Sequence, residues 1–200
     1  PIHETVRMLY RAWEQGRRVF LIGNGGSAST ASHMANDLAK ATIVPGRARM
    51  KVISLADNIS LISAWGNDSS FDVVFREQLV NLLEPGDVVL AITASGNSPN
   101  ILRAIEYARE QGAVTIAWTG RSGGRVKEIV DCCVHAATED VGMIESVHLV
   151  IDHLVADMLL QWIEAGGEVQ ASSRCNELRA VSAWGRRAAG RAVTGERVYE

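Results

Sequence analysis

The sequence contains few of the features that mark secreted, membrane-spanning or nucleic-acid-binding proteins. It has 3 cysteines and no Cys-x-x-Cys spacing, which argues against a disulfide framework and against a cysteine-based zinc site. No charge-free apolar run approaches the roughly 20 residues that a transmembrane helix needs. The first residues do not resemble a signal peptide, and the formal net charge of -3 argues against nonspecific nucleic-acid binding. We therefore expect a cytoplasmic protein with no membrane and no nucleic-acid partner.

What is present suffices for one folded domain. The chain has 200 residues, of which 47% are hydrophobic, so it can bury a sizeable core. Strand-like apolar runs alternate with stretches of helical periodicity, which predicts an α/β fold with a parallel sheet covered by helices on both faces. Strands are expected at 18–22, 50–55, 88–92, 114–119 and 132–136, and helices at 3–16, 28–41, 58–65, 71–83, 99–111, 125–130 and 143–165.

The last part of the chain differs from the rest. Residues 168–200 hold 6 arginines and show little apolar periodicity. We therefore expect a single domain over 1–167, followed by a C-terminal extension over 168–200 that is either helical or disordered.

A hydroxyl-rich segment links the third predicted strand to the helix that follows it. Thr93, Ser95 and Ser98 lie close together there, with Gly96 and Asn97 between them. A turn that opens a helix presents free backbone N–H groups and the positive end of the helix dipole, and hydroxyls add donors without adding charge. The segment therefore predicts a neutral cradle for a phosphate monoester.

A glycine-rich segment, Gly23-Asn24-Gly25-Gly26-Ser27, follows the first predicted strand. Glycines let the backbone approach a ligand closely, and the Asn24 amide can bond sugar hydroxyls, although a simple strand-to-helix turn remains an alternative. The segment is neither a dinucleotide fingerprint, which needs a glycine where Ala28 stands, nor a P-loop, which needs a Gly-Lys-Ser/Thr. Ligands of parallel sheets bind at the carboxyl ends of the strands, so we expect both loops to lie at one binding edge.

His33 and Asp37 are four residues apart on the helix that leaves the first loop. They share a face of that helix, which suits metal binding or acid–base chemistry. The alternative is a surface carboxylate beside a partly buried histidine.

The helix predicted over 143–165 is apolar nearly all round, so we expect it to be buried, in the domain or in an oligomer interface. Polar residues inside it need partners: Glu145, His148, Asp152, His153 and Asp157. They form either a hydrogen-bonded network or a metal or catalytic site. Because Glu145 and His153 are separated by about 12 Å of helix rise, a local pair of His148 with Glu145 or Asp152 is an alternative.

Gly66-Asn67-Asp68 follows the predicted helix 58–65. Asn67 and Asp68 could cap the next segment or contact substrate hydroxyls, and the residue types favour capping.

Taken together, these motifs resemble the SIS (sugar isomerase) domain family, most closely its phosphoheptose isomerase branch, over about residues 1–165. The matching segments are Gly23–Ser27, the His33–Asp37 pair, Gly66-Asn67-Asp68, Thr93–Ser98, Thr119–Gly124, and Ile144–His148 followed by His153. The sequence departs from the family pattern at several positions. Asp37 stands where the family has Glu, Glu145 where it has Gln, and Ala41 where the branch has Arg, and Gly142-Met143 replaces an acidic residue before Ile144.

The resemblance implies a three-layer SIS fold with a five-stranded parallel sheet, and a homotetramer with active sites between subunits. It implies zinc or another divalent metal at His33, Asp37, Glu145 and His153. The implied substrate contacts are Asn24, Gly25, Gly26, Ser27, Asn67, Asp68, Thr93, Ala94, Ser95, Ser98 and Glu145.

The implied activity is aldose–ketose isomerisation of sedoheptulose 7-phosphate to D-glycero-D-manno-heptose 7-phosphate through a cis-enediol. Asp37 would be the base and His153 the second acid–base group. Two alternatives are an isomerase for a different sugar phosphate and a non-catalytic phosphosugar-binding or regulatory SIS protein. A carboxylate and a histidine at the catalytic positions favour an enzyme.

Overall fold

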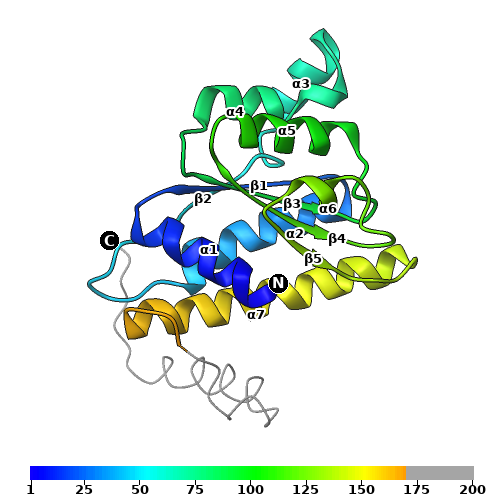
Figure 1. Cartoon of the computed structure of the whole chain (residues 1–200). Helices are drawn as coiled ribbons and strands as arrows, with labels where there is room; N and C mark the ends of the chain where they lie inside the picture. Colours follow the sequence, from blue (N-terminus) through cyan, green and yellow to red (C-terminus); the bar gives the residue numbers. More distant parts are fainter. Residues whose placement is uncertain (170–200) are drawn as a thin grey trace, which may run out of the picture. The chain divides into compact units, whose positions relative to one another are not determined.

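The computed structural model describes residues 1–169, and the rest of the predicted C-terminal extension lies outside the described residues. Pro1–Gly167 forms one compact unit. Its elements, shown in Figure 1, are α1 (Ile2–Glu14), β1 (Arg18–Gly23), α2 (Gly26–Asn36), a π-helical segment (Asp37–Ala41), β2 (Lys51–Ser54), α3 (Ile59–Asp68), a 3-10 turn (Phe71–Val73), α4 (Arg76–Leu82), β3 (Val88–Thr93), α5 (Pro99–Glu110), β4 (Val114–Thr119), α6 (Val126–Ile129), β5 (Cys132–His135) and α7 (Val141–Ala165).

The five strands form one parallel sheet in the order β2-β1-β3-β4-β5, which confirms the predicted α/β architecture. In the centre of the sheet, Leu21 of β1 lies beside Leu90 of β3, which lies beside Ile116 of β4. Helices α1, α2 and α7 cover one face, and α4, α5 and α6 cover the other (Figure 1). The result is the three-layer arrangement expected from the alternation of strands and helices.

The central strand β3 is apolar along nearly its whole length because both faces of the sheet are covered there. Every residue of β3 is buried. On the face that α1 and α7 cover, Trp162 packs against His3 and Tyr10, with ring centroids 5.1 and 5.8 Å apart. Phe20 and Phe75 are buried on the opposite face.

The helix predicted over 28–41 changes character in its second half. It is α-helical to Asn36 and π-helical over Asp37–Ala41. The wider turn keeps Leu38 in the core, while the Asp37 carboxylate lies near His153 of α7. Inserted π turns are frequent at functional sites, and the hydrophobic pattern carries no signal for them.

The prediction of a single helix over 71–83 is wrong. The structure has a 3-10 turn at Phe71–Val73, and α4 begins only at Arg76. Val73, Val74 and Phe75 are all buried, and three consecutive residues cannot lie on one face of a regular α-helix.

Helix α7 buries only one of its sides in the single chain. Met143, Val150 and Leu154 are 56%, 58% and 44% exposed, so the single chain leaves one side of the helix uncovered. The sheet covers one side of α7. The predicted oligomer interface would lie on the other side. Within residues 1–169, no helix is both long enough and apolar enough to cross a membrane.

Candidate functional site

The loops after β1 and β3 lie next to each other, because these two parallel strands are neighbours in the sheet. A reciprocal pair of amide hydrogen bonds joins the loops. Asn24 Nδ2 donates to Asn100 Oδ1 at 2.9 Å, and Asn100 Nδ2 donates to Asn24 Oδ1 at 2.8 Å. We expected the Asn24 amide to be available for sugar hydroxyls. Instead, half of its hydrogen-bonding capacity fixes one loop against the other.

The β3–α5 loop is shaped by its own hydroxyls and by a glycine. The Thr93 hydroxyl accepts a hydrogen bond from the Gly96 N–H, and the Ser95 hydroxyl accepts one from the Asn97 N–H, both at 3.2 Å. Gly96 has φ of 66°, and a Cβ at this position would overlap the backbone of Gly123. The loop therefore has a defined shape that a side chain at position 96 would destroy.

This loop leaves several donors free. The backbone N–H groups of Ser95 and Ser98 and the Ser98 hydroxyl make no hydrogen bond within residues 1–169. Helix α5 begins at Pro99, so the positive end of its dipole lies at the same place. Thr93 is buried, and the Ala94 carbonyl accepts from the Gly120 N–H at 3.2 Å. Free N–H and O–H groups of this kind can hold an anion.

The loop after β1 is crowded by a carboxylate from α7. Gly25, with φ of 56°, precedes α2, which begins at Gly26, and Ser27 is buried. A Cβ at Gly26 would overlap the Glu145 carboxylate. Glu145 thus lies at the N-terminus of α2, where the helix dipole favours a negative charge.

Two histidines and two aspartates meet further along α2 and α7. Nε2 of His33 lies 3.1 Å from Nε2 of His153 and 3.4 Å from Oδ2 of Asp37. Asp37 Oδ2 is 3.8 Å from His153 Nε2, and Asp152 Oδ2 is 4.0 Å from His33 Nε2. One donor atom from each of the four residues lies within 4.8 Å of the others. The fold thus brings together two histidines that are 120 residues apart in the sequence.

The four side chains differ in their access to solvent. The side chains of His33 and His153 are 44% and 55% exposed, and that of Asp37 is 19% exposed. Asp152 has no exposed surface, and neither of its carboxylate oxygens has a hydrogen-bond partner in the described chain. Burial, and then the neighbouring Asp37 carboxylate, raise the pKa of Asp152 to about 7.

This group fits a divalent cation. Imidazole nitrogens and carboxylate oxygens are ligands that zinc and related metals accept. A buried carboxylate without a partner is costly, and a cation beside it would remove that cost. The group differs from the ligand set that the resemblance implies, because it contains Asp152, and Glu145 lies against Gly26. From the sequence, Asp152 stood out only as a polar residue in an apolar helix.

The alternative pair of His148 with Glu145 or Asp152 does not form. His148 is buried, and its Nε2 lies 3.3 Å from the Thr119 carbonyl oxygen. Its Nδ1 has no hydrogen-bond partner among residues 1–169. Burial lowers the pKa of His148, so the neutral imidazole is favoured.

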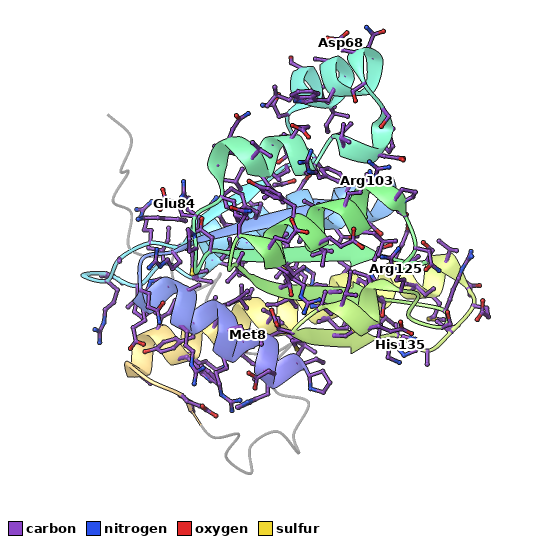
Figure 2. The ribbon with its side chains drawn as sticks, turned by 45° about the horizontal axis from the view of Figure 1, so that its top comes forward. Met8, Asp68, Glu84, Arg103, Arg125 and His135 are labelled. Atoms are coloured by element: carbon purple, nitrogen blue, oxygen red, sulfur yellow. The ribbon has the colours of Figure 1, made fainter. Side chains whose placement is uncertain are left out.

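Asn67 and Asp68 form the last turn of α3 instead of following the helix. Both are exposed, and Asn67 Nδ2 donates to Asp68 Oδ1 at 2.8 Å. The capping interpretation is wrong, because the next segment, Phe71–Val73, has Ser70 at its N-cap and no side-chain cap hydrogen bond. Figure 2 shows Asp68 at the outer end of α3, on the side of the sheet that α4 and α5 cover. Within one chain these residues do not join the group on α2 and α7.

Comparison with known proteins relates this geometry to one family. The model of the SIS domain matches residues 1–120. The phosphoheptose isomerase of Pelobacter propionicus is 39% identical over 156 residues, covering 78% of this chain and 82% of that protein. The lincomycin biosynthesis protein LmbN of Streptomyces lincolnensis is 43% identical over 157 residues, covering 74% of this chain. The match spans only 57% of LmbN.

A solved structure agrees with these sequence matches. The phosphoheptose isomerase from Francisella tularensis superposes with a TM-score of 0.76 at 30% identity. The match covers 80% of this chain and 85% of that one.

Proposed function

Because this chain belongs to the SIS domain family and to its phosphoheptose isomerase branch, we propose that it isomerises sedoheptulose 7-phosphate to D-glycero-D-manno-heptose 7-phosphate. The observation that carries the proposal is the meeting of His33, Asp37 and His153. This group supplies a base, Asp37 on the π-helical segment after α2, and an acid, His153 on α7. An aldose–ketose isomerase needs both.

The β3–α5 loop would anchor the phosphate of the substrate. Ser95 and Ser98 provide N–H groups that are unpaired among the described residues, Ser98 adds a hydroxyl, and α5 adds its positive end. Thr93 and Ala94 shape this loop. The sugar would then lie along the loop of Asn24, Gly25, Gly26 and Ser27, with Glu145 beside it.

The proton transfers need one carboxylate and one imidazole. Asp37 would remove a proton from C1 of the ketose, and the electron pair of that C–H bond would form the C1–C2 double bond of a cis-enediol. His153 would give a proton to the carbonyl oxygen at C2 and help the C1 hydroxyl to lose its own. The protonated Asp37 would then return its proton to C2, which completes the aldose.

We propose that zinc or another divalent cation is bound by the histidine–aspartate group. Such a cation, when bound, would polarise the substrate carbonyl and stabilise negative charge on its oxygen. The two imidazoles and the buried Asp152 carboxylate support this proposal, because all three are suitable metal ligands. In addition, the Asp152 oxygens have no hydrogen-bond partner within residues 1–169.

We also propose a cytoplasmic homotetramer with active sites between subunits. Helix α3 has no buried residue, and its Ile59 is 71% exposed. The outer side of α7 exposes Met143 and Val150. Burying such apolar surface would favour association. Asn67 and Asp68 lie away from the group on α2 and α7, so a substrate contact from them would be made in the site of a neighbouring subunit.

The test is turnover of sedoheptulose 7-phosphate by the full chain and by Asp37→Asn. Asp157→Asn is the matched control, because Asp157 is an exposed carboxylate whose partner is Gln161. Losing a general base should lower kcat by about 100-fold or more, and the control should keep the wild-type kcat. Unchanged turnover in Asp37→Asn would remove Asp37 from the mechanism. A zinc-loaded wild type that turns over no ketose phosphate would instead be a binding protein.

A second candidate is the same reaction on a different sugar phosphate. It is raised by the 43% identity to LmbN, which is named for lincomycin biosynthesis and not as a phosphoheptose isomerase, compared with 39% to the Pelobacter propionicus isomerase. Measuring kcat/KM over ketose phosphates of increasing chain length separates the two candidates. A maximum at sedoheptulose 7-phosphate supports the first, and a maximum at another length supports the second.

A further inference from the structure

The histidine–aspartate group contains two carboxylates whose surroundings differ. If both bound a metal, the site would have four protein ligands and no carboxylate left to accept a proton. Catalytic zinc sites keep three protein ligands, such as two histidines and one carboxylate, and leave one position open. The structure indicates which carboxylate is the ligand.

Asp152 has the surroundings of a ligand. It is fully buried, its Oδ2 lies 4.0 Å from His33 Nε2, and both of its oxygens lack a hydrogen-bond partner within residues 1–169. It precedes His153 directly, so α7 presents both to His33 on α2. A buried carboxylate with neither oxygen occupied has its full binding capacity available to a cation.

Asp37 has the surroundings of a base. Its Oδ1 already accepts a hydrogen bond from Asn36 Nδ2 at 3.1 Å. Its side chain is partly exposed, whereas that of Asp152 is not, and it lies on the π-helical segment with Oδ2 3.8 Å from His153 Nε2. A substrate carbon can reach a carboxylate in this position, whereas it cannot reach Asp152.

We propose that His33, His153 and Asp152 hold the metal in this chain and that Asp37 is left free as the base. Glu145, which lies over Gly26, is then no ligand. The resemblance implies that Asp37 is both metal ligand and base. In this proposal, Asp152 is the ligand and Asp37 is the base. The role of Asp37 rests on the proposed isomerase function, whereas the ligand assignment of Asp152 does not.

The experiment measures zinc affinity without substrate. The full chain is stripped with a chelator and titrated with Zn²⁺ in competition with a chromophoric chelator. Groups that merely orient a ligand contribute about 10–100-fold to metal affinity, so Asp152→Asn should weaken zinc binding by at least about 100-fold. Asp37→Asn should weaken it by less than about tenfold, while losing turnover. Glu145→Gln and the control Asp157→Asn should bind zinc as the wild type does.

Three results would overturn the assignment: a wild type that binds no zinc, an Asp152→Asn variant that keeps its affinity, or an Asp37→Asn variant that loses as much affinity. Circular dichroism checks that each variant folds. If Asp152→Asn does not fold, Co²⁺ bound to the wild type and to Asp37→Asn provides a second readout. Identical visible spectra support an Asp37 that is no ligand, and different spectra refute it. Absence of turnover on every sugar phosphate would overturn the isomerase function alone.

Discussion

Removing the charge of Asp152 should stabilise the metal-free protein, by an amount that grows with pH. Burial and Asp37 raise the pKa of Asp152 from an ordinary 3.8 to about 7 in the native state. Below about pH 4 both states carry the proton, so the group contributes no difference. As the pH rises, the unfolded chain releases its proton while the native state retains it, and stability falls. A shift of about 3 units at 1.36 kcal/mol each gives a full penalty of about 4 kcal/mol above about pH 7.

Urea unfolding with a chelator present, at fixed protein concentration, measures this penalty. Wild type and Asp152→Asn should have similar free energies of unfolding near pH 4, and the variant should gain up to about 4 kcal/mol near pH 8. Asp157→Asn, which removes a solvated carboxylate of the same helix, should follow the wild-type curve. A difference between wild type and Asp152→Asn that is constant, or that shrinks as the pH rises, would refute the assignment of a buried, unpartnered carboxylate.

Three further predictions concern the two loops and the outer face of α7. Gly96→Ala should abolish competitive inhibition by inorganic phosphate, because its Cβ would overlap the loop backbone. Gly46→Ala has a similar φ of 78° in open space, so it should cost only about 1 kcal/mol of strain and leave inhibition intact. Gly26→Ala should raise KM, and adding Glu145→Ala should restore it, with a coupling of about 0.5–3 kcal/mol. Val150→Arg should give smaller assemblies by light scattering, and unchanged mass would show that this face is no interface.

The fold could be predicted because it follows from local periodicity. Each of the five strands was expected from an apolar run, and parallel strands with helical crossovers leave few possible topologies. The errors arose where packing decides the local geometry. The π turn at Asp37 and the break before Arg76 keep particular side chains in the core, and the hydrophobic pattern of one segment cannot show this.

The site could be predicted only in part, for a geometric reason. Glu145 and Asp152 are seven residues apart and therefore lie on the same side of α7, separated by about 10 Å along its axis. The sequence cannot tell which of these two turns of α7 faces His33, because that depends on how α7 packs against α2. In the structure, Glu145 reaches the start of α2 at Gly26, and Asp152 reaches His33 further along.

The position of Glu145 also bears on where the phosphate binds. Two helix N-termini lie at the carboxyl edge of neighbouring strands, that of α2 after β1 and that of α5 after β3. Either could attract an anion by its dipole and free N–H groups. A carboxylate already lies against Gly26 at the start of α2, so a phosphate there would meet a like charge. The start of α5 has unpaired N–H groups at Ser95 and Ser98 in the described chain and hydroxyls in place of a carboxylate. In the proposed isomerase, like-charge repulsion at one loop and free donors at the other would orient the sugar phosphate in one direction.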